Sequence, residues 1–270
     1  MSDAGPMFAG SVPENYDRYL VPLIFKPYAA DLARRVAGLS PAAVLEIAAG
    51  TGAGTRELAP KLTPGTRYVA TDLSQPMLDH ARGQQADAGR IEWRQADAMA
   101  LPFEDGAFDL VLCQFGAMFF PDRVTAYREV LRVLKPGGQF LFNVWDRLDR
   151  NEFARDVMAA IAAIFPEDRP DFFERVPHGY HDVEQIRRDL RDAGFSRIAI
   201  ETKAEQRHAP SVRHVALAFC HGTPLLGEIE ARNPGGLDAT TARVEAALAA
   251  KHGQGDISAR IQAHVITAEA

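Results

Sequence analysis

Short apolar runs alternate with stretches of helical periodicity between residues 43 and 145, and this alternation limits the folds open to the chain more than any other feature. Five of the runs are expected to be strands, at residues 43–48, 67–71, 91–95, 108–114 and 139–145. The first is interrupted only by Glu46, which is typical of a strand buried on both faces. The alternation predicts an α/β fold with a doubly wound, mostly parallel sheet and helices on both faces.

Helical segments are expected on both sides of this core. Ser11 and Glu14 have the spacing of a capping box, and the helix that they open should be interrupted at Pro22 and Pro27. After residue 145 we expect helices at 151–164, 182–194, 212–221 and 239–252, a loop or lid at 166–181, and strands at 195–205 and 256–265. The predicted organisation is an N-terminal helical lid (1–38), a ligand-binding core (39–146), and further strands with helical cap insertions (147–270) in the same domain.

Composition excludes several classes of protein. The 270 residues are 47% hydrophobic and 24% charged, which is ordinary for a globular chain. The net charge of −6 argues against a nucleic-acid partner, because an acidic chain gains little from neutralising phosphates. No apolar run reaches the length of a membrane span, and residues 1–16 lack the features of a signal peptide. Cys113 and Cys220 are isolated, so we expect a reduced, cytoplasmic protein without zinc.

A turn of small residues follows the first predicted strand and opens a helix, in the segment VLEIAAGTGAGT (44–55). Small residues let a ligand lie against the backbone, and the helix start offers free N–H groups. A dinucleotide site requires G-x-G-x-x-G/A, but the frame from Gly50 ends in Thr55 and the frame from Ala48 lacks the first glycine. Glu46, two residues before the turn, would repel a pyrophosphate and suits a cationic ligand.

Two more carboxylates follow the next two predicted strands. Asp72 stands where a carboxylate accepts both ribose hydroxyls, and Asp97 can accept from an exocyclic amine. Ser74 is expected to cap the following helix, which leaves Asp72 for a ligand. The alternatives are a buried acid paired with a lysine or backbone amides for Glu46, a helix-entry residue for Asp72, and a solvated loop carboxylate for Asp97.

Four motifs between about residues 40 and 145 resemble those of the class I S-adenosylmethionine-dependent methyltransferases, in particular the type 11 family. They are VLEIAAGTGAGT, ATDLSQPMLDHA, QADAMALPFEDGAFDLVLCQFG and EVLRVLKPGGQFLFNVW. The resemblance implies a Rossmann-like methyltransferase fold, with S-adenosylmethionine as cofactor and S-adenosylhomocysteine as product. It also implies that Glu46 and the 48–52 turn hold the methionine part, Asp72 the ribose and Asp97 the adenine amine.

The same resemblance implies the remaining cofactor contacts. They are the turn residues Ala48, Gly50, Thr51 and Gly52, then Leu73 and Met77 beside ribose and adenine, the backbone of Ala98, and Gln114 and Phe115 near the sulfonium. Ala48 departs from the family pattern, which usually has a glycine there, and its methyl group is expected to shift that part of the ligand.

The acceptor site is expected beyond the fifth strand. Methyl transfer from a sulfonium is an in-line displacement, so the protein mainly positions the two reactants. Side chains that could act as a base are His178, His181, Tyr180, Tyr16 and Asp122, with His221 more remote. Asn143, Trp145, Tyr180 and the 166–181 loop are predicted to bind the substrate, and Tyr16 and Tyr19 to form part of the lid. The helices around residues 220–226 should cover the pocket or form a homodimer contact.

We therefore predict a methyltransferase that acts on a small, partly hydrophobic acceptor and not on a protein or RNA. The spacing of His178 and His181 is H-x-x-H, but no third ligand accompanies them, so we expect no metal. One alternative is a nicotinamide-dependent oxidoreductase, against which Glu46 and the incomplete glycine pattern argue. Another is a non-catalytic S-adenosylmethionine-binding protein, because the reaction needs no dedicated nucleophile.

Overall fold

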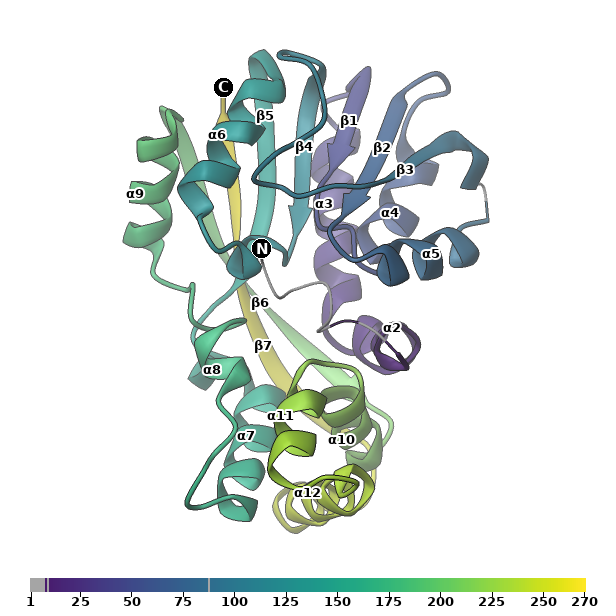
Figure 1. The fold of residues 1–270 in the computed structure, drawn as a ribbon, viewed down its shortest axis with the longest axis vertical. Coiled ribbons are helices and arrows are strands. Elements are labelled where there is room, and N and C mark those ends of the chain that lie inside the picture. The colour runs from purple at the N-terminus through teal and green to yellow at the C-terminus, as the bar shows by residue number, and fades with distance from the viewer. Residues whose placement is uncertain (1–7, 9, 87) are drawn as a thin grey trace.

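A seven-stranded sheet in the order β3-β2-β1-β4-β5-β7-β6 forms the centre of the computed structural model, which describes residues 8, 10–86 and 88–270 (Figure 1). The strands are β1 (Ala43–Glu46), β2 (Arg67–Asp72), β3 (Ile91–Gln95), β4 (Phe108–Gln114), β5 (Leu134–Trp145), β6 (Arg197–Ala209) and β7 (Ile257–Glu269). The first five are parallel, and β7 pairs antiparallel with both β5 and β6. The predicted doubly wound, mostly parallel sheet is confirmed.

Helices cover both faces of the sheet (Figure 1). They are α2 (Val12–Asn15), α3 (Lys26–Ala37), α4 (Ala53–Leu58), α5 (Gln75–Gln84), α6 (Arg123–Val133), α7 (Glu152–Ile164), α8 (Phe172–Arg175), α9 (Val183–Ala193), α10 (Val212–His221), α11 (Leu225–Arg232) and α12 (Leu237–His252). Val44 and the strand residues that point to the same face of the sheet pack with α3 and α4. Leu45 and the residues that point to the opposite face pack with α6 and α9. The central strands are therefore apolar at almost every position because both faces are buried.

The N-terminal helical segment departs from the prediction. α2, a π-helix (Tyr16–Phe25) and α3 follow one another without a break, so Pro22 and Pro27 do not interrupt the helix. Pro22 lies in the π-helical stretch, and Pro27 lies in the first turn of α3, where a missing N–H is tolerated. The predicted capping box is also wrong, because the Ser11 side chain caps nothing. Residues 1–7 and 9 of the predicted lid lie outside the described residues.

A group of helices gathers around the far ends of β6 and β7, which extend beyond the rest of the sheet (Figure 1). We call α7, α8, α10, α11 and α12 the helical cap. The segment 166–181, expected to be a loop, contains the short helix α8. α9 begins and ends as predicted, with the Asp182 side chain accepting from the first turn and Gly194 in the left-handed conformation. Among the described helices, none is long and apolar enough to cross a membrane.

Candidate functional site

A cavity opens at the carboxyl ends of β1, β2 and β4, where open α/β sheets bind their ligands. Its empty volume, including the open mouth, is about 1290 Å³. Three parts of the chain line it: the N-terminal helical segment, the loops after the parallel strands, and the helical cap. The predicted cofactor residues found in its lining are Tyr16, Ala48, Gly50, Thr51, Asp72, Leu73, Met77, Asp97, Ala98, Gln114 and Phe115. The structure thus brings most of the predicted cofactor set to one cavity.

The turn after β1 is strongly bent. Ala48, Gly50 and Gly52 all have positive φ, at 52°, 57° and 80°. Ala48 is unusual in this left-handed conformation, which glycine adopts most readily. Its methyl group is accommodated because Gly116 lies opposite, where an added Cβ would come within 2.4 Å of the Ala48 Cβ. A missing side chain at residue 116 therefore compensates for the extra methyl group at residue 48.

Glu46 lies behind this turn at the end of β1 and is buried. Its Oε2 accepts hydrogen bonds from Thr55 Oγ1, at 2.6 Å, and from the Tyr68 hydroxyl. Its Oε1 has no hydrogen-bond partner in the described part of the chain. Burial raises the pKa of the Glu46 carboxyl to about 7, because a charge without solvent is unfavourable.

A second acceptor atom without a partner lies close to the first. Gln114 Nε2 donates to the carbonyl of Phe25 at 3.1 Å, but Gln114 Oε1 is buried and unpaired among the described residues. A Cβ added to Gly54 would lie 2.5 Å from Glu46 Oε1 and 3.0 Å from Gln114 Oε1. Two unpaired acceptors beside a glycine, one of them a carboxylate, suit a cationic donor such as an ammonium group. Neither of the alternatives for Glu46, a lysine partner or backbone amides, is present among its described contacts.

Asp72 holds the same turn from the neighbouring strand. Its Oδ2 accepts from Gly50 N, and its Oδ1 accepts from Ser74 N, both at 2.8 Å. The predicted Ser74 cap is wrong, because its side chain makes no capping bond and Asp72 takes the Ser74 amide instead. Burial raises the pKa of Asp72. Each Asp72 oxygen retains a second lone pair for a ligand in the cavity.

Asp97 lines the cavity after β3, with Oδ1 accepting from Met99 N at 2.9 Å. We expect Asp97→Ala to weaken S-adenosylhomocysteine binding by about three- to tenfold, since one partly exposed hydrogen bond is lost. The loss should be smaller when the guanine analogue of this ligand is titrated, because its base lacks the adenine amine. Calorimetric titration of both ligands measures this, and an equal loss for both would contradict the adenine assignment.

The N-terminal helical segment is attached to the glycine turn through Asp17. Asp17 Oδ1 accepts from Thr51 Oγ1 at 3.0 Å and pairs with Arg56. Tyr16, the next residue back, lines the cavity and stacks on Phe25, with ring centroids 5.0 Å apart. Tyr19, predicted to share the lid, does not line the cavity, and its carbonyl faces His214 Nε2 at 2.9 Å.

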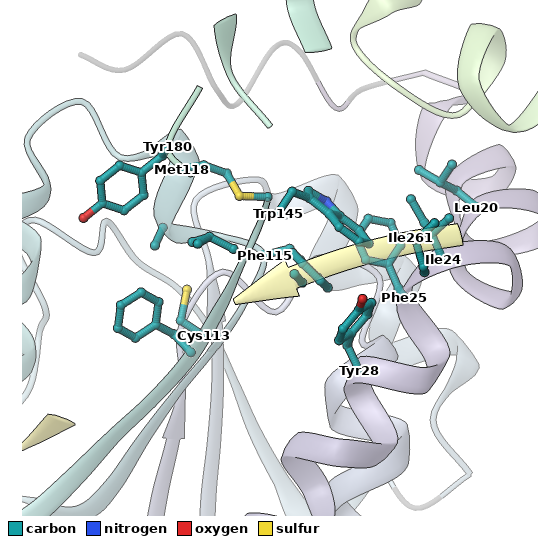
Figure 2. Packing of buried hydrophobic residues seen from close by; sticks show 14 of the residues in the cluster. Leu20, Ile24, Phe25, Tyr28, Cys113, Phe115, Met118, Trp145, Tyr180 and Ile261 are labelled. Atoms are coloured by element: carbon teal, nitrogen blue, oxygen red, sulfur yellow. The ribbon is translucent and has the colours of Figure 1, made fainter. Parts of the chain in front are cut away.

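Aromatic side chains form the wall beyond the turn. Trp145 stacks on Phe115, with ring centroids 4.0 Å apart and planes at 13°, and Phe25 and Tyr28 lie against this pair (Figure 2). Across the cavity the lining is also apolar, with Met118, Phe119, Phe172, Phe173, Pro177 and Pro224. Thr223 and Pro224 show that the segment between α10 and α11 covers the pocket, which was one of its two predicted roles.

The structure does not bring the other predicted acceptor and base residues to this cavity. Asn143 is buried and accepts from Phe115 N at 2.9 Å, Tyr180 donates to Asp189 at 2.7 Å, and Asp122 caps α6. His178 and His181 are absent from the lining, and His221 contacts Thr241. Among the described residues, the ionisable side chains of the lining are Tyr16, Asp72 and Asp97, and no cluster of metal-ligand type is found.

Some residues of the site were not predicted. Gly54 belongs to the quoted turn motif, so its small size was a signal that could have been used. Asp17 and Arg56 are ordinary charged residues on two helices, and nothing in their local sequence indicates that they pair. The predicted 166–181 segment does contribute Phe172, Phe173 and Pro177 to the lining, whereas Thr223 and Pro224 reach it through packing between distant segments.

Comparison with known proteins agrees with this geometry. A family model described as a methyltransferase domain, of type 11, matches residues 45–142. A demethylmenaquinone methyltransferase of Lactococcus lactis is 28% identical over 206 residues, 71% of this chain and 81% of that enzyme. A ubiquinone/menaquinone biosynthesis C-methyltransferase of Hahella chejuensis is 43% identical over 103 residues, 37% of this chain and 41% of that enzyme. The chain thus spans less than half of the second relative.

A solved structure from Thermotoga maritima has the same fold. It is described as an S-adenosylmethionine-dependent methyltransferase and a possible histamine N-methyltransferase. Its TM-score to this chain is 0.56, with 18% identity, and 98% of each chain is covered. Residues 45–142 therefore match the methyltransferase domain of type 11, and the cofactor of this methyltransferase is S-adenosylmethionine.

Proposed function

We propose that the chain methylates a small, uncharged, largely apolar aromatic acceptor. The observation that carries this proposal is the make-up of the cavity, which has carboxylates at one end and aromatic side chains at the other. No lysine, arginine or histidine lines it among the described residues, so an anionic acceptor would have no counter-ion. The aromatic end instead offers flat apolar surfaces, which suit a ring.

The residues at the acidic end fit S-adenosylmethionine. Glu46 Oε1 and Gln114 Oε1 would accept from the ammonium group, Asp72 from the ribose hydroxyls and Asp97 from the adenine amine. When bound, this cofactor supplies an electrophilic methyl group. Tyr16 would close the site from the N-terminal side and exclude water from the reacting atoms.

The described residues of the cavity lining offer no effective base to the acceptor. Asp72 and Asp97 are assigned to the cofactor, and burial raises the pKa of Tyr16 above its ordinary value, so its hydroxyl stays protonated. We infer that the acceptor reacts at an atom that is nucleophilic without prior deprotonation, such as the ring carbon of a hydroquinone, which loses its proton to solvent after the methyl group is attached. The two relatives named for menaquinone and ubiquinone biosynthesis support this class of acceptor.

Two measurements test the proposal. We expect S-adenosylmethionine or S-adenosylhomocysteine at 100 times its dissociation constant to add about 2.7 kcal/mol of stability and raise Tm by about 5 °C or more. NADH and NADPH should cause no shift. Tritium from methyl-labelled S-adenosylmethionine should then be transferred to 1,4-dihydroxynaphthalene and not to O-phosphoethanolamine. A shift without transfer to 1,4-dihydroxynaphthalene would contradict the proposed acceptor class, and a shift with a nicotinamide alone would contradict the methyltransferase function.

We also propose that the enzyme is cytoplasmic and has no nucleic-acid partner. The net charge of −6 and the two isolated cysteines support this. The predicted homodimer contact around residues 220–226 is less favoured, because Cys220 and Leu225 are buried within the chain itself. The proposal also includes the division of the chain into an N-terminal helical lid (1–38), a cofactor-binding core (39–146) and a region with further strands and cap helices (147–270).

A further inference from the structure

A second, smaller cavity lies next to the main one on the far side of Trp145. Its empty volume, including its opening, is about 260 Å³. Ile24, Trp145 and Phe173 line both cavities, so three side chains form the partition between them. Figure 2 shows Trp145 with Met118 of the main cavity on one side and Ile261 of the smaller cavity on the other.

His178 supplies an unusual polar group in the lining of the smaller cavity, which is otherwise mostly apolar. The residue is only 5% exposed. Its Nδ1 lies 2.7 Å from the carbonyl oxygen of Asp146, which can only accept, so Nδ1 carries the proton. Burial lowers the pKa of the imidazole to about 4, and the ring is therefore neutral at pH 7. Nε2 is left as an acceptor, and it has no hydrogen-bond partner among the described residues.

The Asn151 side chain of this lining is already paired at both its nitrogen and its oxygen. Asn151 Nδ2 donates to the carbonyls of Asp146, Arg147 and Gln262, and its Oδ1 accepts from Gln262 N. His178 Nε2 is thus an acceptor that this mostly apolar lining could present to a polar ligand. A neutral imidazole nitrogen without a partner has its lone pair available for a ligand that donates a hydrogen bond.

We propose that the smaller cavity is an extension of the acceptor site, which receives a small apolar group that ends in a hydroxyl, and that His178 Nε2 accepts a hydrogen bond from this hydroxyl. This inference rests on the proposed function, because it assumes that the acceptor ring lies against Trp145 in the main cavity. His178 then acts as a residue that selects the acceptor, some distance from the transferred methyl group.

The test uses fluorescence of Trp145, one of only two tryptophans in the chain. In a Trp93→Phe background saturated with S-adenosylhomocysteine, phenol, 4-butylphenol and 4-(3-hydroxypropyl)phenol are titrated while Trp145 emission is recorded. The two substituted phenols have tails of equal length, and only one tail ends in a hydroxyl. We expect 4-(3-hydroxypropyl)phenol to bind at least as tightly as 4-butylphenol, and both to bind more tightly than phenol.

Variants separate the hydroxyl contact from the space around it. His178→Phe should weaken the binding of 4-(3-hydroxypropyl)phenol by about five- to tenfold, since one hydrogen bond is lost. The affinity for 4-butylphenol should change by less than about twofold. His208→Phe is the control and should change neither affinity, because His208 is exposed on β6 and lines neither cavity. Ala154→Leu, which fills the smaller cavity, should weaken the binding of both substituted phenols and leave the affinity for phenol itself unchanged. If that variant does not fold, Ile261→Ala should instead favour the tailed phenols.

The outcomes are distinguishable from failure of the proposed function. The inference would be overturned if His178→Phe weakened the binding of both substituted phenols equally. It would also be overturned if all three phenols bound with the same affinity. Failure of all three phenols to bind while S-adenosylhomocysteine binds would also overturn it and leave the methyltransferase function intact. Failure of S-adenosylhomocysteine itself to bind would contradict the proposed function.

Discussion

Glu46→Gln is expected to lower the affinity for S-adenosylhomocysteine by about 30- to 1000-fold, which corresponds to roughly 2–4 kcal/mol for a buried charge pair. The buried Oε1 of Glu46 has no partner of its own and lies near the equally unpaired Gln114 Oε1. A ligand ammonium would satisfy both atoms. A glutamine at this position keeps an oxygen for Thr55 and Tyr68, but its amide group donates where the ligand must donate.

The same substitution should leave the fold as stable as before, or more stable. In the free protein the glutamine amide could donate to Gln114 Oε1, which removes two unsatisfied buried acceptors at once. The pKa of Glu46 is raised from 4.5 to about 7, so the folded state binds its proton more tightly than the unfolded state. Its contribution to stability is therefore present below pH 4.5 and lost as pH rises to about 7. The gain in Tm for Glu46→Gln should be largest above pH 7.

Ligand affinity should depend on pH through this carboxyl. Below pH 7 Glu46 is mostly protonated in the free protein and attracts a cation poorly. Between pH 8 and pH 6 the wild-type affinity should therefore fall by about tenfold, and in Glu46→Gln it should stay nearly constant. Calorimetric titration of S-adenosylhomocysteine at both pH values measures this. Glu57→Gln on α4 is the matched control, and wild-type affinity in Glu46→Gln would contradict the assigned role.

The sheet, and the gathering of most of the proposed cofactor residues at one cavity, could be predicted because their signals are local. Each parallel strand is a short apolar run. Glu46 and Asp72 end β1 and β2, and Asp97 lies just after β3, so all three lie at the carboxyl edge of the sheet. The errors near the N-terminus have a local cause as well. A proline in a helical pattern normally ends the helix, but the π-helical stretch around Pro22 removes that conflict.

The acceptor side was predicted less well, because its residues meet only in the folded molecule. Trp145 was expected there and does line the cavity, since it ends a strand. Asn143, two residues earlier on the same strand, is occupied by the backbone of Phe115 instead. Tyr180 and His178 have no periodic signal that would tell which way they face. Their positions follow from the packing of the helical cap, which local sequence does not determine.

Asp72→Ala is expected to cause the second large effect, a loss of about 30- to 1000-fold in affinity for S-adenosylhomocysteine, or roughly 2–4 kcal/mol. Part of this loss has a structural cause, because the substitution leaves the amides of Gly50 and Ser74 without their acceptors. Each unsatisfied N–H costs about 1–3 kcal/mol, so Tm should also fall. Calorimetry gives the affinity and thermal unfolding gives the stability.

A ligand without the ribose hydroxyls separates the two contributions. In wild-type protein, 2′,3′-dideoxy-S-adenosylhomocysteine should bind much more weakly than S-adenosylhomocysteine, because Asp72 loses its ligand donors. In Asp72→Ala the two ligands should bind almost equally, since the group that distinguishes them is gone. If the variant still preferred the natural ligand by the wild-type ratio, Asp72 would support the turn through Gly50 and Ser74 without binding the ribose. Equal affinities in the variant, together with a large ratio in the wild type, would assign the ribose contact to this carboxylate.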